Sequence, residues 1–190
     1  MMQKPICYTI GHSNHPIDAF LKHLKDHNIQ KVVDIRRKPY SSFAPQYQKK
    51  SLQKMLHHQG IIYVFLGKKL GGFKRVPPDE WTSGIHELIH HIQLEKANYS
   101  DYNTTILCSE GDPSKCHRAF LVAPSLMDNN IQVVHILPNS NLLCHLELEE
   151  LLLNKYFPER HQLSIFDQCT REELLQKAYF KRRKDSSGLK

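Results

Sequence analysis

The sequence predicts an α/β fold in which helices cover both faces of a mainly parallel sheet of about five strands. Short apolar segments with β-branched residues recur five times along the chain, and between them apolar residues repeat at helical spacing. Strands that alternate with helices in this way pair in parallel, because each helix returns the chain to the start of the sheet. The 190 residues suffice for one such domain with a sizeable core.

Each strand is predicted from its own apolar run, and each helix from its apolar face and its ends. The predicted strands are residues 7–10, 31–35, 61–66, 105–108 and 132–137. Pro16 opens a first helix, and Gly60 ends a second one. Pro77 introduces a third helix. Pro113 opens a fourth, with Asp112 as the cap that accepts hydrogen bonds from free amides of the first turn.

The chain changes in character after residue 138. Residues 1–138 form the predicted α/β domain, and residues 139–190 form a C-terminal helical extension of the same structural unit, which ends in a basic, disordered tail. The extension comprises a leucine-rich helix over residues 142–153, an irregular segment over 157–167 and a basic helix over 171–183. We expect it to pack on the sheet or to form a homodimer contact.

The net charge of +7 resides mainly in the C-terminal segment. Residues 171–190 hold seven Lys and Arg against three Asp and Glu, which leaves 19 against 16 for the rest of the chain. A body so nearly balanced is not uniformly basic, so a nucleic-acid-binding face has to be a local cluster. The best clusters before the C-terminal segment are residue 31 and residues 36–38, 49–50, 68–69 and 74–75.

The sequence also predicts the compartment. No apolar run approaches the length of a membrane span, and no signal peptide precedes the first predicted strand. We therefore expect a cytoplasmic protein. Its five cysteines are odd in number and scattered along the chain, which favours reduced thiols over the disulfide framework of a secreted protein.

The loops that follow the strands carry most of the reactive side chains. In an open parallel sheet, ligands bind at the carboxyl ends of the strands, where the direction of the chain connections reverses. This rule places one candidate site across the loops after the first four strands. The predicted catalytic residues are Cys116, His12, Asp34 and Glu110, and the predicted substrate-binding or anion-binding residues are Arg36, Arg118, Ser13, His117, Gly71 and Gly72.

The stretch 104–118 carries the densest chemistry, because a strand, a turn cluster and a helix start meet in it. Cys116 is a candidate nucleophile if it lies at a helix N-terminus beside basic side chains, which stabilise its thiolate. The alternative is a cysteine that packs in the core. His12 and Asp34 are the best acid/base candidates; a loop hydrogen bond and an ion pair to arginine are their respective structural alternatives.

Anion binding is the second reading of the same stretch. Arg36, Arg118 and free amides near Ser114 together suit a phosphate or a carboxylate. Asp112 weakens the backbone part of such a site, because as a cap it already occupies those amides. Position 114 is a serine where a phosphatase-type Cys-x5-Arg loop needs arginine, so the arginine side chains carry this hypothesis.

Neither a metal site nor a cofactor is predicted. Cys108, Cys116, His117 and His12 together make a Cys2His2 set, but their spacing lacks the usual short pair of cysteines. On a helix, the side chains of Cys116 and His117 diverge by about 100°, which hinders binding of one ion by both.

A second pattern of metal ligands lies in the third predicted helix. His86 and His90 flank the zinc-peptidase pattern H-E-x-x-H, in which both histidines bind the metal. The apolar residues of that helix define a core face that both histidines avoid. We therefore expect them to be surface histidines.

Five ordered motifs resemble the signature set of a known family. They are Thr9-Ile-Gly-His-Ser13; Asp34-Ile-Arg36 with Pro39 and Ser41; Tyr63 with Leu70-Gly-Gly72; Cys108-Ser-Glu110 with Pro113; and Cys116-His-Arg118. From residue 8 to residue 137 the chain resembles the family called domain of unknown function 488. The resemblance implies a Rossmann-like three-layer α/β fold and an association with nucleotide or nucleic-acid metabolism. It implies nothing for residues 139–190.

We expect an enzyme, a Cys/His/Asp-dependent hydrolase or transferase, that acts on a small anionic substrate of phosphorylated, nucleotide-like or nucleic-acid-derived chemistry. A non-catalytic nucleic-acid or nucleotide binding module is the alternative, and a metallohydrolase is the third reading. Aromatic residues interleaved with basic ones suit base stacking, although hydrophobic anchoring of loops is their commoner use. These residues are Tyr40, Phe43, Tyr47 and Phe73. No membrane partner is expected, and a homodimer is one expected assembly.

Overall fold

The computed structural model describes residues 4–40, 42–72, 76–98, 102–161 and 169–187. Six strands form one sheet in the order β3-β2-β4-β1-β5-β6, and each neighbouring pair is parallel except β5 and β6. The strands are β1 Ile6–Gly11, β2 Ile29–Asp34, β3 Ile62–Phe65, β4 Asn103–Cys108, β5 Gln132–Ile136 and β6 Leu142–Cys144. The five predicted strands are confirmed, and β6 is additional.

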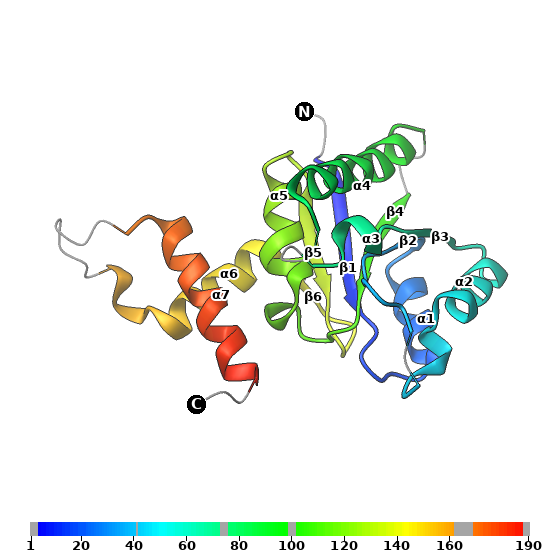
Figure 1. Cartoon of the computed structure of the whole chain (residues 1–190), viewed down its shortest axis with the longest axis horizontal. Helices are drawn as coiled ribbons and strands as arrows, with labels where there is room; N and C mark the ends of the chain where they lie inside the picture. The colour runs from blue at the N-terminus through cyan, green and yellow to red at the C-terminus, as the bar shows by residue number, and fades with distance from the viewer. Residues whose placement is uncertain (1–3, 41, 73–75, 99–101, 162–168, 188–190) are drawn as a thin grey trace.

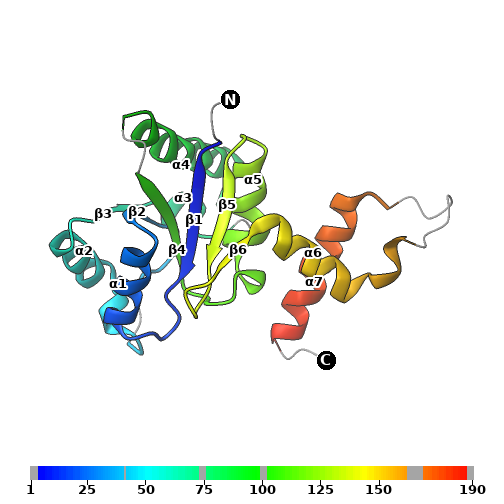
Figure 2. The same ribbon diagram turned by 180° about the vertical axis from the view of Figure 1, so that it is seen from behind.

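Helices cover both faces of the sheet (Figures 1 and 2), so the predicted three-layer α/β fold is confirmed. The covering elements are α1 Ile17–Asp26, η1 Pro45–Tyr47 and α2 Lys49–His58 on one face, and α3 Gly67–Leu70, α4 Pro78–Asn98 and α5 Ala123–Met127 on the other. Val32 packs in the core on the face covered by α1 and α2, and Val33 packs in the core on the face covered by α3, α4 and α5. Successive side chains of a strand point to opposite faces of the sheet.

The start of the C-terminal extension differs from the prediction of one helix over residues 142–153. Residues 142–144 form β6, which pairs antiparallel with β5, and α6 His145–Tyr156 begins only after it. The amide of Cys144 donates to the Glu147 carboxylate at 3.1 Å, which caps the new helix start. A run of leucines alone does not separate a short edge strand from a first helical turn, so the boundary was wrong.

The segment after β4 also differs from the single helix predicted to start at Pro113. A 3-10 turn, η3 Pro113–Lys115, is followed by Cys116 in an extended conformation with φ −115° and ψ 141°. A π-helical turn, η4 Arg118–Val122, then leads into α5. Asp112 does cap the first of these turns, because it accepts from the amide of Ser114 at 2.9 Å. Cys116 therefore lies just before the helical segment that begins at His117 and leads into α5, and its carbonyl oxygen accepts from the amides of Ala119 and Phe120.

The C-terminal extension packs on the domain as a helical hairpin of α6 and α7 Arg171–Ser187, with the turn η5 Pro158–His161 after α6 (Figure 1). Its core consists of Leu148 and Leu152 of α6, Ala178 and Tyr179 of α7, and Ala119 of η4. The hairpin thus covers the π-helical turn that follows the cysteine-containing segment. The predicted tail after Ser187, and most of the predicted irregular segment 157–167, lie outside the described residues.

His86 and His90 are exposed on α4, as expected from its core face. Among the described residues, no helix combines the length and the apolar character needed to cross a lipid bilayer.

Candidate functional site

The carboxyl ends of β1, β2 and β4 lie side by side and are held together by backbone hydrogen bonds. The amide of His12 donates to Cys108 O at 3.0 Å, and the amide of Ser13 donates to Ser109 O at 2.8 Å. On the other side of β4, the amide of Ile35 donates to Leu107 O at 3.1 Å. β1 and β2 lead to helices on one face, whereas β4 leads to the other. The loops therefore meet where the connections reverse direction.

Arg118 lies beneath this edge, not in a position to meet a substrate. Its side chain is fully buried, and Nε donates to Thr9 Oγ1 at 3.2 Å. Nη1 and Nη2 donate to the carbonyl oxygens of Glu110 and Gly111, the latter at 2.9 Å. The guanidinium thus holds the loop after β4 to the first strand. The prediction that Arg118 binds a substrate anion does not fit this burial.

Asp34 and Arg36 form a closed structural group. Arg36 Nε and Nη2 donate to the two carboxylate oxygens of Asp34 at 2.9 Å and 2.7 Å, and both side chains are buried. The Tyr63 hydroxyl donates to Asp34 Oδ2 at 2.6 Å, and the Arg36 amide donates to Oδ1 at 3.0 Å. Burial and the neighbouring Asp34 raise the pKa of Tyr63. The structural alternative considered for Asp34, an ion pair to arginine, is what the structure contains.

His12 is held in one tautomer beside this group. Its Nδ1 lies 2.6 Å from Ser13 O, and it must donate because a carbonyl only accepts. The ring stacks on Tyr47 with centroids 4.2 Å apart and 19° between the planes. Burial and the nearby Arg36 guanidinium lower the pKa of His12 to about 4. The imidazole is therefore neutral at pH 7, with the lone pair on Nε2.

Two cysteines and a histidine come together at the end of β4. Cys108 Sγ lies 3.7 Å from His117 Nδ1, and Cys116 Sγ lies 3.9 Å from the same nitrogen. The three donor atoms lie within 4.8 Å of one another, and both cysteines are buried free thiols. His117 Nε2 is buried and has no hydrogen-bond partner among the described residues. The extended backbone at Cys116 brings this cluster together; a continuous helix would have kept Cys116 and His117 apart.

The two thiols differ in their electrostatics. The Cys116 side chain and the Arg118 charge, with the amides of Ser109 and Glu110, outweigh burial and lower the pKa of Cys108 to about 7. Burial, and then the neighbouring Cys108, raise the pKa of Cys116. These shifts favour Cys108 as the thiol that loses its proton first, whereas the sequence singled out Cys116. Cys108 is the more acidic thiol of the two.

The cluster fits a soft divalent cation. A tetrahedral zinc site with bonds of about 2.3 Å to sulfur and about 2.0 Å to nitrogen has sulfur-to-nitrogen edges of about 3.6 Å. The observed separations of 3.7 Å and 3.9 Å are close to that value. Amides directed at Cys108 suit a thiolate ligand, since they compensate its charge. The helical divergence of Cys116 and His117, which argued against a metal, does not exist in the folded chain. His12 is not part of this donor set among the described residues.

The remaining predicted residues lie at the surface or in backbone packing. Ser13 and Glu110 are exposed. A Cβ on Gly71 would lie 2.2 Å from Gly67 O and 2.6 Å from Arg37 Cα, so this glycine permits close contact with the chain itself. Gly72 has φ +115°, a conformation that favours glycine. No candidate catalytic side chain is among the nearest atoms to a Cβ built at either glycine.

Sequence reasoning missed the buried polar partners of the site. Thr9 lies inside β1 and links Arg118 to His135 of β5, at 2.7 Å from His135 Nδ1. The available signal was a histidine within an otherwise apolar strand, because a buried imidazole requires partners. Tyr47, proposed for base stacking, is instead buried against His12, and Phe73 lies outside the described residues.

A cavity of about 290 Å³ lies at the opposite, amino edge of the sheet. Its lining includes Lys4, Asn130, Gln132, Cys144 and His145. None of the predicted site residues contributes to it. The chemistry of the carboxyl edge makes that edge the candidate site, because the cysteines and basic loops gather there.

Part of the chain matches a known protein family. Residues 16–83 match the family model described as Domain of unknown function DUF488. The matched segment contains the motifs at Asp34–Arg36 and at Tyr63 with Leu70–Gly72, but it ends before the two cysteine motifs. Neither the curated proteins nor the solved structures gave a significant match to the chain. The resemblance to the DUF488 family, predicted from five motifs, is thus confirmed over residues 16–83.

Proposed function

We propose that the protein is a metal-dependent hydrolase in which Cys108, Cys116 and His117 bind a divalent cation of the zinc class. The observation that carries this proposal is the gathering of three soft donor atoms within 4.8 Å at the carboxyl edge of the sheet. Catalytic zinc sites use three protein ligands, because the fourth position is kept for water or substrate. When bound, such a cation supplies Lewis acidity and a water nucleophile at neutral pH.

The protein's own residues prepare the site in three ways. Arg118 holds the carbonyl groups of the loop between the two cysteines, so the amides of Ser109 and Glu110 are free to face Cys108. The buried sulfur atoms exclude bulk water from the ligands. The exposed carboxylate of Glu110, two residues after Cys108, is the proposed acceptor of the proton that hydrolysis releases.

The loop after β2 supports an anionic, nucleotide-like substrate. Tyr40 is 75% exposed and Phe43 is 94% exposed, and Arg37 and Lys38 on the same loop are also exposed. Flat aromatic side chains bind bases by stacking, while basic side chains bind phosphate. The loop that carries these side chains follows β2 at the carboxyl edge of the sheet, where the cysteine cluster also lies. We therefore propose a nucleotide or a nucleic-acid-derived phosphoester as the substrate class.

Metal content tests the centre directly. Purified protein should contain about one zinc ion per chain by elemental analysis. Cys108→Ser, Cys116→Ser and His117→Ala should each lose most of it, whereas Cys144→Ser and Cys169→Ser, which change cysteines outside the cluster, should retain it. Cobalt substitution should give a thiolate charge-transfer band in the same variants that retain zinc. Wild-type protein that binds neither metal at stoichiometric level contradicts the proposal.

Turnover tests the reaction class. The metal-loaded protein should hydrolyse a chromogenic phosphomonoester or phosphodiester, and a chelator should abolish the rate. Cys108→Ser should abolish the rate as well, while Cys144→Ser should leave it unchanged. Hydrolysis that persists both in the presence of the chelator and in Cys108→Ser would contradict a reaction at the proposed metal centre.

A non-catalytic nucleic-acid or nucleotide binding module is the second candidate, and the exposed aromatic residues Tyr40 and Phe43 favour it. Binding of a fluorescent single-stranded oligonucleotide should weaken with salt and with a Phe43→Ala substitution. If this binding is present while every phosphoester tested is inert, the binding module is the better account. Salt-insensitive or absent binding removes it.

A further inference from the structure

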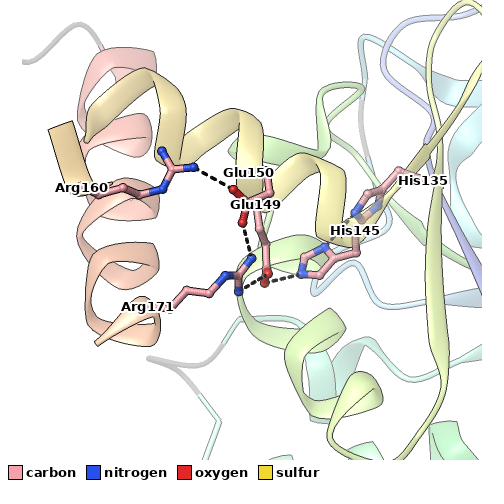
Figure 3. Close-up of polar contacts among 6 residues, drawn as sticks. All are labelled: His135, His145, Glu149, Glu150, Arg160 and Arg171. Carbon is pink, nitrogen blue, oxygen red and sulfur yellow. Dashed lines mark hydrogen bonds and ion pairs between the residues drawn. The ribbon is translucent and has the colours of Figure 1, made fainter. Parts of the chain in front are cut away.

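A chain of buried polar side chains joins the C-terminal hairpin to the loop between the two cysteines. It begins at Arg118, whose Nε donates to Thr9 Oγ1. Thr9 Oγ1 lies 2.7 Å from His135 Nδ1, and His135 Nε2 lies 3.0 Å from His145 Nδ1. His145 Nε2 is 3.2 Å from Glu149 Oε1, a polar contact that is not aligned as a full hydrogen bond. Figure 3 shows the part of this chain that crosses from β5 to α6.

One assignment of the ring tautomers runs the donors through the chain in a single direction. Arg118 can only donate, so Thr9 Oγ1 accepts from it, and in this assignment the Thr9 hydroxyl donates its own hydrogen to His135 Nδ1. His135 then carries its proton on Nε2 and donates to His145 Nδ1. His145 in turn carries its proton on Nε2, directed toward the Glu149 carboxylate. The donors therefore run from a buried cation to a buried anion, and the aligned dipoles reinforce one another.

Glu149 connects this chain to α7. Arg171 Nη1 donates to Glu149 Oε2 at 2.9 Å, and Arg171 Nη2 donates to Glu150 Oε1 at the same distance (Figure 3). Glu150 also accepts from Arg160 at 2.8 Å, but it does not reach either histidine. Glu149 is the member of this acidic pair that couples the two helices of the hairpin to the sheet.

The polar chain from Glu149 to Arg118 is the first connection, or arm, between the hairpin and the cysteine-containing segment. A second arm reaches the same segment from α7. Arg182 Nε donates to Ser114 Oγ at 2.8 Å, and Arg182 Nη2 donates to Asp112 Oδ2 at 2.7 Å. Asp112 is the cap of η3, and Ser114 lies two residues before Cys116. The hairpin therefore holds the segment between the cysteines at two points, one through Arg118 and one through Arg182.

We propose that the α6–α7 hairpin is a positioning element for the loop that joins Cys108 to Cys116, with Glu149 and Arg182 as its positioning residues. Docking of the hairpin completes the polar chain that ends on Arg118, and Arg118 fixes the carbonyl groups of residues 110 and 111. Loss of either arm loosens the spacing of the sulfur atoms. The consequence for metal affinity rests on the proposed function, whereas the mechanical coupling does not.

Two adjacent glutamates provide a matched test of the first arm. Glu149→Ala removes the contact to His145 and one contact to Arg171, whereas Glu150→Ala removes contacts to Arg160 and Arg171 only. Hydrogen exchange of the amides of Ser13, Lys115 and Cys116, which are bonded across or within the loop, should be about tenfold faster in Glu149→Ala. Glu150→Ala should leave it unchanged. Glu149→Gln, which still accepts from His145, should restore most of the protection.

The second arm has its own control on the same helix. Arg182→Met should accelerate exchange at Ser114, Lys115 and Cys116, and Arg182→Lys should recover part of the protection. Lys181→Met removes a neighbouring cation that contacts Phe157 and not the loop, so it should have no effect there. Each variant is compared at a temperature well below its measured midpoint of unfolding, which separates local opening from global instability.

The outcomes separate this inference from the proposed function. Equal exchange in Glu149→Ala and Glu150→Ala, or unchanged exchange in Arg182→Met, overturns the inference whether or not a metal binds. If exchange responds as expected but zinc does not bind, the hairpin positions a metal-free dithiol loop and the proposed function alone fails. If zinc binds, Glu149→Ala should weaken its affinity about tenfold, as loss of an outer-shell contact does, and Glu150→Ala should not.

Discussion

Asp34 holds Arg36 through both carboxylate oxygens, at 2.9 Å and 2.7 Å, in a pair that is buried at the carboxyl edge of the sheet. The Tyr63 hydroxyl donates to the same carboxylate. Because the backbone amide of Arg36 also donates to it, the aspartate sets the direction in which the chain leaves β2. These contacts favour a structural role for Asp34, in which it fixes the start of the loop after β2.

We expect Asp34→Asn to lower the free energy of unfolding by about 3–5 kcal/mol, because it leaves the Arg36 charge buried without its partner. Asp26→Asn is the control, since Asp26 pairs with Lys22 at the same 2.7 Å distance on the exposed surface of α1. Its effect should be close to zero, because solvent screens such pairs. Urea unfolding measures both. An Asp34→Asn protein of wild-type stability that lacks activity would instead show that Asp34 is catalytic.

The pKa of His12, lowered to about 4, predicts a loss of stability in acid. The unfolded chain binds a proton near pH 6.5, whereas the folded chain keeps this imidazole neutral, so the unfolded state binds more protons between these values. The stability contributed by His12 is complete above about pH 6.5 and falls as the pH approaches 4. Between pH 7 and pH 5 the loss from this residue should be about 2 kcal/mol.

His12→Gln provides the control for this pH dependence. Glutamine can still donate to Ser13 O but does not titrate. The variant should show a smaller decrease in unfolding free energy between pH 7 and pH 5 than the wild type, whatever its absolute stability. His135, whose pKa burial lowers well below its ordinary value, contributes a decrease of the same sign in both proteins. Identical slopes for wild type and variant would contradict the assignment to His12.

Gly11 is required by the approach of two loops. A Cβ at this position would lie 1.7 Å from Glu110 O and 2.9 Å from an Arg118 nitrogen. Gly11→Ala should therefore push the loop after β4 away from β1 and lower the unfolding temperature strongly. Gly60→Ala is the matched case, because Gly60 has φ +70° but nothing within 4 Å of a Cβ. It should cost only about 1 kcal/mol, the strain of a positive φ. Comparable unfolding temperatures for the two variants would refute the steric argument.

The sheet was predictable because its strands are short, apolar and separated by helical patterns. Val32 and Val33 both had to be buried for a strand covered on both faces, and they are. β6 was not predictable in this way, since its three residues begin a leucine-rich run and are stabilised by pairing with β5. A local sequence pattern predicts an element only when the residues of that element determine its conformation. The conformation of β6 is determined by its pairing with β5.

The candidate site was predictable as a place but not as a set of contacts. The rule for parallel sheets located the carboxyl edge, and the motifs supplied Cys108, Cys116 and His117. The extended backbone at Cys116 was not predictable, because Pro113 and Asp112 signal a helix start equally well for a single 3-10 turn. The role of Arg118 depended on its depth of burial, which no sequence pattern gives.

Addition of zinc should stabilise the folded protein, because a ligand that binds only the native state adds to its free energy of unfolding. At a free zinc concentration of about 100 times the dissociation constant, the gain should be about 2.7 kcal/mol. Cys144→Ser should show the same gain, whereas Cys108→Ser and Cys116→Ser should not. Calorimetry with buffered zinc and with chelator measures the shift. A gain that persists in Cys108→Ser would place the bound zinc away from the end of β4, on other histidines of the chain.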